Sequence, residues 1–419
     1  MKITIIGAGI IGVTTSYFLA KHGYEVDVIE RLEGPALETS FANAGMITPS
    51  MADPWNSPGI LTTLVKNIGR KDSAFLLRLK ALPSLIGWGL SFLLNSSEKN
   101  FLKNTHLSAG LSCYSLKILK ELRAELGLEY EQRETGSLKV FRDKANMDKY
   151  AKISSYLEQY DMRFKVVYGN EILEIEPSLE PIIDELCGAI FYPDDEAGNA
   201  YKFTCEIAKA AEEAGVKFRY GVSVEKLNMA GGAVSGITTN EGEVKADKYI
   251  LCAGSFSPPL AKGVGVNIPV RPVKGYSISV PLNGWNKGPI MPIIDDGFHA
   301  AITPLGDILR IAGTAEFAGY DDHLDQDRIN NLYELLEEIY PNFGAAVKRE
   351  YVKEWCGFRP MSTDGVPFIG ETPVGNLFVN TGHGPLGWTM ASGSAKMLCD
   401  ILTGAAPELD PNAYGLKRP

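Results

Sequence analysis

Three glycines near the start of the chain, Gly7, Gly9 and Gly12, have the spacing G-x-G-x-x-G. They follow an apolar, β-branched run at Lys2–Ile6 and precede a segment with helical periodicity at Val13–His22. In such a strand–turn–helix unit the glycines allow a tight turn and a close approach of the backbone to a pyrophosphate, which lies at the positive end of the helix dipole. The spacing therefore predicts a dinucleotide site.

A carboxylate follows at the place where the ribose of such a dinucleotide would lie. Glu30 comes directly after a second apolar strand, Val26–Ile29, and eighteen residues after Gly12. An acidic side chain in this position accepts hydrogen bonds from the ribose hydroxyls. The unit is common to NAD and FAD sites, so the choice between the two depends on other segments.

Two further segments favour FAD. Glu38–Gly45 (ETSFANAG) has small residues around Ser40 and Asn43, so that a flat ring system can lie against the backbone. Asn380–Met390 (NTGHGPLGWTM) reads as a glycine turn before a helix, whose N–H groups and dipole would stabilise negative charge on a reduced flavin. His383 in this turn either donates a hydrogen bond to the flavin or holds the turn itself, and both alternatives stay open.

Arg359, in the segment Gly357-Phe-Arg-Pro, is the candidate for substrate binding. A guanidinium group matches a carboxylate through two parallel hydrogen bonds, which would fix the α-carbon of an amino acid over the flavin. The alternative is an ion pair between domains. No nucleophile or metal is expected, because the cofactor carries the redox chemistry.

These motifs together resemble the D-amino acid dehydrogenase family, a part of the wider group of glycine oxidase, sarcosine oxidase and D-amino acid oxidase. The resemblance covers essentially the whole chain. It rests on GAGIIG with Glu30, on ETSFANAG, on PVKGYSI at Pro272–Ile278, on WCGFRPMSTDGVPFIG at Trp355–Gly370 and on NTGHGPLGWTM.

The resemblance implies FAD, a two-domain fold and oxidation of a small amino acid, most often a D-amino acid. The products would be a 2-oxo acid and ammonia, formed after hydride transfer to flavin N5. Arg359 matches the arginine that holds the substrate carboxylate in this group. A respiratory electron acceptor is expected, with oxygen as the alternative. A glycine, sarcosine or other secondary-amine oxidase is the second candidate function, and a flavin-binding module without turnover is a remote third.

The sequence departs from the family at one place. The dehydrogenases carry an aromatic hydroxyl followed by lysine ahead of an Ala-Ile-Thr strand, whereas this chain has Phe298 and His299 there. Phenylalanine cannot donate the hydrogen bond of a tyrosine, so His299 is expected to replace it. Tyr276 in the KGYSI motif is another candidate hydroxyl, and a packing role for Tyr276 is an equal alternative.

The predicted site residues are of two kinds. The expected catalytic residues are Arg359, His299 and Tyr276. The expected FAD-binding residues come from the glycine motif, the two flavin segments and the middle of the chain: Gly7, Ala8, Gly9, Ile10, Ile11, Gly12, Glu30, Arg31, Ser40, Asn43, Ala44, Gly45, Val224, Ala253, Gly254, Gly384, Leu386, Gly387, Trp388 and Thr389.

The elements that must position these residues predict an α/β fold, in which a Rossmann-like FAD-binding domain is interleaved with an antiparallel-sheet α+β substrate domain. Helices are expected at about 96–127, Phe203–Ala214, Arg328–Ile339 and about 385–402, and a strand at Val244–Leu251. Residues 1–80, 195–265 and 350–419 are assigned to the FAD-binding domain. Residues 81–194 and 266–349 are assigned to the substrate-binding domain.

Composition limits the partners. A formal net charge of -10 over 419 residues argues against nucleic acid binding. Six cysteines without a C-x-x-C pair are typical of a reduced compartment, and Met1–Ile6 leaves no room for a signal peptide, so a cytoplasmic protein is expected. The apolar stretch Ala81–Leu94 is too short to span a bilayer and is read as a packing helix, with peripheral contact at the inner face of the cell membrane as the alternative.

Overall fold

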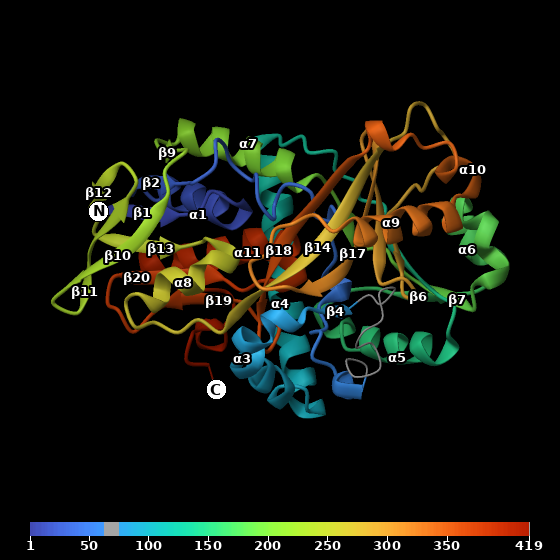
Figure 1. Cartoon of the computed structure of the whole chain (residues 1–419), viewed down its shortest axis with the longest axis horizontal. Helices are drawn as coiled ribbons and strands as arrows, with labels where there is room; N and C mark the ends of the chain where they lie inside the picture. The colour runs from blue at the N-terminus through green and yellow to red at the C-terminus, as the bar shows by residue number, and fades with distance from the viewer. Residues whose placement is uncertain (63–74, 419) are drawn as a thin grey trace.

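Two large sheets organise the chain in the computed structural model, which describes residues 1–62 and 75–418 (Figure 1). The first sheet has six strands in the order β19-β20-β13-β1-β2-β9. Every pair of neighbouring strands in this sheet is parallel except β19 and β20, which are antiparallel. Its strands are β1 (Lys2–Ile6), β2 (Glu25–Ile29), β9 (Lys217–Arg219), β13 (Lys248–Leu251), β19 (Phe368–Glu371) and β20 (Leu377–Thr381).

Both faces of this sheet are covered, which explains why its strands are continuous apolar runs. Side chains such as Ile3 and Ile5 face a core shared with four helices, and side chains such as Ile6 and Leu251 face a small three-stranded sheet. The helices are α1 (Ile10–Lys21), α4 (Glu98–Leu126), α7 (Ala200–Glu213) and α11 (Gly387–Thr403). The small sheet consists of β10 (Val224–Ala230), β11 (Ala233–Thr239) and β12 (Gly242–Val244), next to α8 (Ser257–Lys262).

The second large sheet is mixed and has nine strands in the part of the chain that the structure describes. Most neighbours are antiparallel, but β15 runs parallel to β5 and β17 runs parallel to β4. The strands are β4 (Phe75–Leu77), β5 (Ser137–Phe141), β6 (Lys165–Val167), β7 (Gly188–Tyr192), β14 (Val270–Pro281), β15 (Ile293–Asp295), β16 (Ala300–Leu305), β17 (Ile308–Phe317) and β18 (Lys353–Ser362).

One face of the mixed sheet packs against α9 (Gln326–Ile339), and this core includes Tyr276, Ile278 and Ile311. The other face is turned toward the first sheet. It carries Ser277 of β14 and Ala312 of β17, which lie directly opposite each other. Four further helices are α3 (Leu82–Leu94), α5 (Lys144–Ser155), α6 (Asn170–Ile175) and α10 (Pro341–Gly344). The two-stranded pair β3 (Met46–Ile47) and β8 (Glu196–Ala197) is buried next to α11.

The expected fold class is confirmed, with differences in detail. The run Val244–Leu251 is not one strand, because its polar middle turns the chain. Asp247 there accepts a hydrogen bond from the Lys2 backbone, and the two ends belong to different sheets, as β12 and β13. The helical region after residue 96 is one helix, α4, of 29 residues.

The two-domain division stays a prediction, and the sheets indicate where its boundaries would move. β18 lies in the segment assigned to the FAD-binding domain, yet it pairs with β14 of the mixed sheet. α4 lies in the segment assigned to the substrate domain, yet it packs against α11. Among the described residues, no helix combines the length and the apolar character needed to cross a bilayer.

Candidate active site

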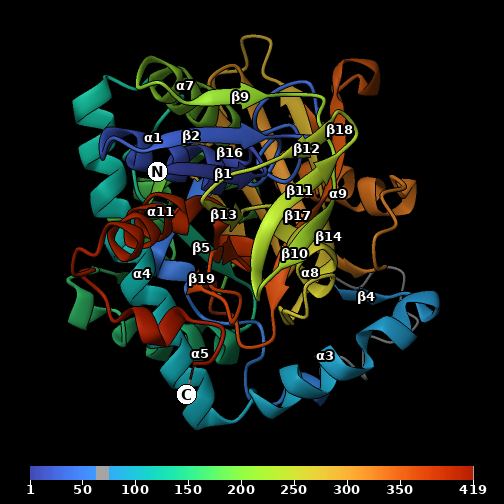
Figure 2. The same ribbon diagram turned by 90° about the vertical axis from the view of Figure 1, so that its left-hand side faces the viewer.

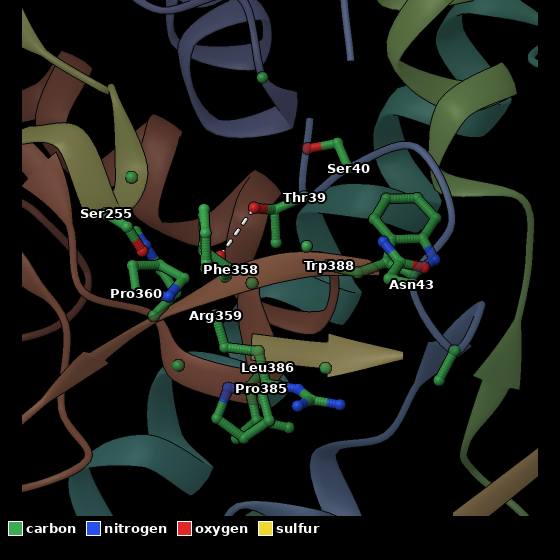
Figure 3. A pocket seen from close by; sticks show the side chains of 18 of the residues that line it. Thr39, Ser40, Asn43, Ser255, Phe358, Arg359, Pro360, Pro385, Leu386 and Trp388 are labelled. Atoms are coloured by element: carbon green, nitrogen blue, oxygen red, sulfur yellow. Dashed lines mark hydrogen bonds between the residues drawn. The ribbon is translucent and has the colours of Figure 1, made fainter. Parts of the chain in front are cut away.

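The parallel strands of the first sheet deliver four separated motifs to one edge. The chain leaves β1 at Gly7, β2 at Glu30, β13 at Cys252 and β20 at Gly382. Because the carboxyl ends of parallel strands share an edge, these residues meet there although up to 375 positions separate them in sequence. A cavity of about 940 Å³ begins at this edge and continues to the mixed sheet. Figure 3 shows part of its wall.

The glycine motif forms a cradle in which two of the glycines have no room for a side chain. Gly7 has φ +106°, and a Cβ atom on it would lie 2.7 Å from the Cys252 carbonyl oxygen. A Cβ atom on Gly12 would lie 2.0 Å from the Gly7 carbonyl oxygen. Helix α1 can therefore pack close to β1 and β13, and its N-cap Gly9 and first residues Ile10 and Ile11 line the cavity.

Glu30 is held in place by backbone groups. Its carboxylate accepts hydrogen bonds from the Ala8 N–H at 2.8 Å and from the Leu32 N–H at 3.0 Å. Next to it, the Arg31 guanidinium pairs with Glu38 and lies 4.0 Å from the centre of the Phe256 ring. The carboxylate is thus fixed at the cavity wall, where its remaining acceptor capacity can meet a ribose.

The segment 38–45 is hydrogen-bonded to helix α1 and to the mixed sheet. The Ser40 hydroxyl oxygen accepts a hydrogen bond from the Ile10 N–H at 3.1 Å. The Asn43 carbonyl oxygen accepts one from Arg310 Nη1 at 2.7 Å, and the Asn43 side chain accepts one from the Gly45 N–H at 2.9 Å. Ser40 and Asn43 line the same cavity, as Figure 3 shows.

The C-terminal turn supplies another wall. A short 3-10 helix, Gly384–Leu386, leads into α11, and Pro385 and Leu386 both line the cavity. The Thr389 hydroxyl accepts a hydrogen bond from the Thr48 N–H at 3.0 Å, and the Trp388 indole N–H donates to the Gly198 carbonyl at 3.1 Å. These bonds fasten the start of α11 to the residues that directly follow β3 and β8.

His383 holds this turn from within. It is buried, and its Nε2 lies 3.1 Å from the Ser394 hydroxyl. Burial lowers the pKa of His383 to about 3, so the ring is neutral at physiological pH. Of the two alternatives for this residue, the contact with Ser394 supports the structural one.

The mixed sheet presents small side chains and one arginine to the cavity. Gly275 of β14 lies directly opposite Gly357 of β18, and Arg359 follows two residues later on the same face. A Cβ atom on Gly275 would lie 2.3 Å from Arg359 Nη1, so the guanidinium occupies the space that this glycine leaves free. Arg359 Nη1 donates to the Thr314 carbonyl at 2.8 Å.

The charge of Arg359 has no acidic partner among the residues that the structure describes. Burial lowers its pKa to about 10, and no neighbouring carboxylate opposes this shift. The centre of the Trp55 ring lies 5.7 Å from Arg359 Cζ. A buried guanidinium without a counter-ion is unfavourable, so this position suits an incoming anion.

The structure places His299 and Tyr276 differently. His299 lines the cavity next to the ring of Phe75, with centroids 5.9 Å apart. Burial lowers the pKa of His299, while Asp296 opposes the shift, so the imidazole is neutral at pH 7. Tyr276 also borders the cavity, but its hydroxyl donates to Glu316 and its ring belongs to the core on the far face of the mixed sheet. That hydroxyl is not brought to Arg359 and His299.

Most of the predicted residues meet at this cavity. All line it except Ala8 and Gly12, whose contacts shape the cradle as described above. The sequence reasoning missed several residues that line it at the end near the mixed sheet: Asp53, Trp55, Lys139, Asp296 and Thr314. Nothing in their local sequence marks them, because they reach the cavity through strand register and loop packing.

The shape of the cavity fits FAD. Its wall includes the open cradle of the glycine motif, the fixed carboxylate of Glu30 and the turn before α11. The part at the mixed sheet is floored by the small side chains Ala301 and Ala312, which leave room for a flat ring.

Known proteins share this sequence and fold. The family described as FAD dependent oxidoreductase (DAO) matches residues 2–401. A D-amino acid dehydrogenase of Paramagnetospirillum magneticum is 40% identical over 419 residues, which is 100% of this chain and 99% of the relative. A D-amino acid dehydrogenase of Allorhizobium ampelinum is 40% identical over 418 residues, with 100% and 98% covered.

Solved structures agree in fold at lower identity. Glycine oxidase from Bacillus cereus superposes with a TM-score of 0.74 at 21% identity, covering 99% of this chain and 97% of that one. L-proline dehydrogenase from P. horikoshii gives 0.76 at 19% identity, with 99% and 96% covered. With the matches in sequence, these findings show that the chain belongs to the DAO family of FAD dependent oxidoreductases.

Proposed function

We propose that this chain is a D-amino acid dehydrogenase, which oxidises a small D-amino acid to the 2-oxo acid and ammonia. The observation that carries this proposal is Arg359, a buried cation on the cavity wall with no acidic partner among the described residues. The full-length relatives named D-amino acid dehydrogenase support the stereochemistry. Bound FAD supplies the hydride acceptor.

The protein's own residues bind the substrate and prepare it. The Arg359 guanidinium binds the α-carboxylate through two hydrogen bonds and so fixes the α-carbon. His299, neutral at pH 7, takes a proton from the α-ammonium group. The nitrogen lone pair of the neutral amine can then form the C=N bond as the hydride leaves the α-carbon. The small side chains of Ala301 and Ala312 leave room for the substrate above the sheet.

Anaerobic reduction of the bound flavin by a panel of amino acids tests this function. We expect D-amino acids to bleach the flavin, and L-amino acids, glycine, sarcosine and proline derivatives to do so far more slowly. With His299 replaced by alanine, proton removal falls to water, so the rise of kcat/KM with pH should move to higher pH while FAD stays bound. Preferential reduction by glycine or sarcosine would instead identify a secondary-amine oxidase.

For the cofactor, we propose that the adenosine end of FAD lies by Glu30 and Arg31 and the flavin between segment 38–45 and the turn before α11. The sites for the ring are then Ser40, Asn43 and Leu386, while Ala253, Gly254 and Val224 border the nucleotide end. The supporting observation is that all of these residues line one continuous cavity.

Replacing Glu30 with alanine should weaken FAD binding by about 1.5–3 kcal/mol, because charge-assisted hydrogen bonds to the ribose are lost. Titration of the apoprotein with FAD, followed by flavin fluorescence, measures the change. Glu30→Gln, which keeps the size and one acceptor oxygen, serves as the matched variant and should lose less. Unchanged affinity in both variants would show that the ribose lies elsewhere.

We further propose that the enzyme passes electrons to a respiratory acceptor while it rests on the inner face of the cell membrane. Helix α3 supports this, since it lies at the edge of the molecule (Figure 2). Its Trp88 and Phe92 are buried against the mixed sheet, whereas four apolar residues, one turn apart, are exposed. They are Leu82 (38% exposed), Ile86 (63%), Leu90 (60%) and Leu94 (77%).

Vesicle binding tests the contact. Replacing Ile86 and Leu90 together by aspartate should lower binding to phosphatidylethanolamine–phosphatidylglycerol vesicles at least about tenfold, because two apolar side chains no longer enter the lipid. Tyr351→Asp, at an exposed aromatic residue outside α3, is the control and should bind as the wild type. Equal binding of all three proteins would contradict the role of α3, and rapid oxygen consumption would contradict the respiratory acceptor.

A further inference from the structure

Two aromatic side chains lie beside Arg359 on the cavity wall. The centre of the Trp55 ring lies 5.7 Å from Arg359 Cζ, and the centres of the Trp55 and Phe75 rings lie 5.6 Å apart at an interplanar angle of 89°. Two rings in this edge-to-face arrangement form a corner rather than a flat surface. The aliphatic side chains of Ile60 and Ala315 line the cavity as well. We call Trp55, Ile60, Phe75 and Ala315 the aromatic corner.

Strand pairing places this corner next to the anchor of the arginine. Ala315 of β17 is paired with Phe75 of β4, and the carbonyl of the preceding residue, Thr314, accepts the hydrogen bond from Arg359 Nη1. Thr314 has φ +58° and lies at an irregularity in the pairing of β14 with β17. Such bulges re-aim side chains next to binding sites. One short stretch of β17 therefore holds both the guanidinium and the corner.

An apolar cluster supports the corner from behind. The corner packs with Trp88 and Phe92 of α3 and with Met361 of β18. The Trp88 and Phe92 rings stack with their centres 5.0 Å apart, and the Trp88 indole N–H donates to the Met361 carbonyl at 3.1 Å. Because β18 also carries Arg359, the corner and the guanidinium keep a fixed spacing. A pocket preorganised in this way loses little entropy when a ligand enters it.

A substrate side chain starts close to the aromatic corner. The β-carbon of an amino acid is two bonds from its carboxylate carbon, only about 2.5 Å away by standard bond lengths. With the carboxylate on Arg359, an aromatic or branched side chain can cross from the guanidinium to the Trp55 ring and fill the corner. The single methyl group of alanine leaves most of the corner uncovered, so less apolar surface is removed from water.

The corner favours a neutral, apolar group over a polar or charged one. Apart from the indole N–H of Trp55, its side chains carry no hydrogen-bonding group, so a polar side chain would lose water there without replacement. The Arg359 guanidinium already lies over the Trp55 ring, and it would repel a second cation at the same ring. An anionic side chain would compete with the α-carboxylate for that guanidinium.

We infer that Trp55 and Phe75 bind the substrate side chain, and that D-amino acids with aromatic or branched aliphatic side chains are preferred over polar ones of equal size. This inference rests on the proposed function, since it places the α-carboxylate on Arg359. The two perpendicular rings offer one ring face and one ring edge, which suits a third ring packed between them.

Two pairs of D-amino acids test the inference in the holoenzyme. D-Leucine and D-asparagine have nearly the same size but differ in polarity, whereas D-phenylalanine and D-alanine differ by a phenyl group. We expect kcat/KM in the wild type to be at least about tenfold higher for the first member of each pair. Trp55→Ala should lower both ratios at least about fivefold, mainly through KM, because contact with the indole ring is lost. Trp55→Phe, which keeps a ring, should retain most of the preference, and Phe75→Leu should lower the ratio for D-phenylalanine more than the ratio for D-leucine.

Trp285→Ala is the matched control, because Trp285 is also half-buried but stacks on Phe343 outside the cavity. Its two ratios should equal those of the wild type. Wild-type ratios at or below one would overturn the inference. A Trp55→Ala variant that loses activity equally toward all four substrates would overturn it too, and a variant that loses its FAD would show that Trp55 contacts the cofactor instead.

A ligand that cannot be oxidised separates this inference from the proposed function. 3-Phenylpropanoate has the carboxylate and the phenyl group of phenylalanine but no amine. Its binding, followed through the flavin spectrum, should be at least about tenfold tighter than that of propanoate and should weaken in Trp55→Ala. If no D-amino acid reduces the wild-type flavin, the proposed function fails and this binding difference alone decides on the corner. If D-alanine reduces the flavin as well as D-phenylalanine does, only the role of the corner fails.

Discussion

Replacement of Arg359 by alanine should slow flavin reduction by the best D-amino acid about 100- to 1,000-fold. The guanidinium is the one cation in this part of the cavity without an acidic partner among the described residues, so the α-carboxylate loses its binding group. A substrate held loosely rarely has its α-carbon in the reactive position, and misplacement by about 1 Å can cost 100-fold. Anaerobic stopped-flow spectroscopy measures the step directly.

Arg359→Lys separates charge from geometry. Lysine keeps the positive charge but offers no planar fork, so we expect a loss that is smaller than in Arg359→Ala and still at least about tenfold. Both variants should contain nearly the wild-type amount of FAD, because Arg359 is on β18 of the mixed sheet and not in the glycine cradle. Wild-type reduction with unchanged substrate affinity in Arg359→Ala would place the carboxylate elsewhere.

Gly275→Ala should produce nearly the same defect without touching the arginine. The new methyl group would lie 2.3 Å from Arg359 Nη1 and 2.4 Å from its Cζ. Strand β14 is hydrogen-bonded to β17 on one side and to β18 on the other, so its backbone cannot easily yield. The guanidinium must move and lose its bond to the Thr314 carbonyl, and we expect flavin reduction to slow about 100-fold.

Gly375→Ala is the matched control for this experiment. No atom lies within 4 Å of the Cβ position of Gly375, so an added methyl group there meets open space. Flavin reduction should be unaffected in this control, and FAD content should be normal in both proteins. If Gly275→Ala reduces its flavin as fast as the wild type, the guanidinium is not held over Gly275 in the working enzyme.

The glycine cradle and Glu30, proposed to hold the nucleotide half of FAD, were predictable because they lie close together in sequence. Gly7 to Gly12 and Glu30 belong to one strand–helix–strand unit whose local geometry determines its ligand. The turn before α11 was visible for the same reason, since glycines and Pro385 define it within a few residues. An error of one residue in the predicted strand register changes little in such short units.

The substrate half was less predictable, because strand register determines which way a side chain points. Tyr276 and Ser277 are neighbours in sequence, yet the Tyr276 ring enters the core by α9, while Ser277 lies on the opposite face of the sheet and its hydroxyl donates to the Ala42 carbonyl. A motif shows that both residues are present but not which face of the sheet each side chain takes. Lys139 and Asp53 likewise meet only through pairing of β5 with β15 and through loop packing.

The order of strands in the first sheet also affects how the protein is made. β13 lies between β1 and β20, and about 130 residues separate the end of β13 from the end of β20. At common translation rates a ribosome needs roughly 6 to 26 s for that distance, during which one edge of β13 has no strand to pair with. The turn before α11 emerges later still, so a nascent chain cannot complete its flavin pocket. Cofactor insertion should therefore follow emergence of this turn from the ribosome.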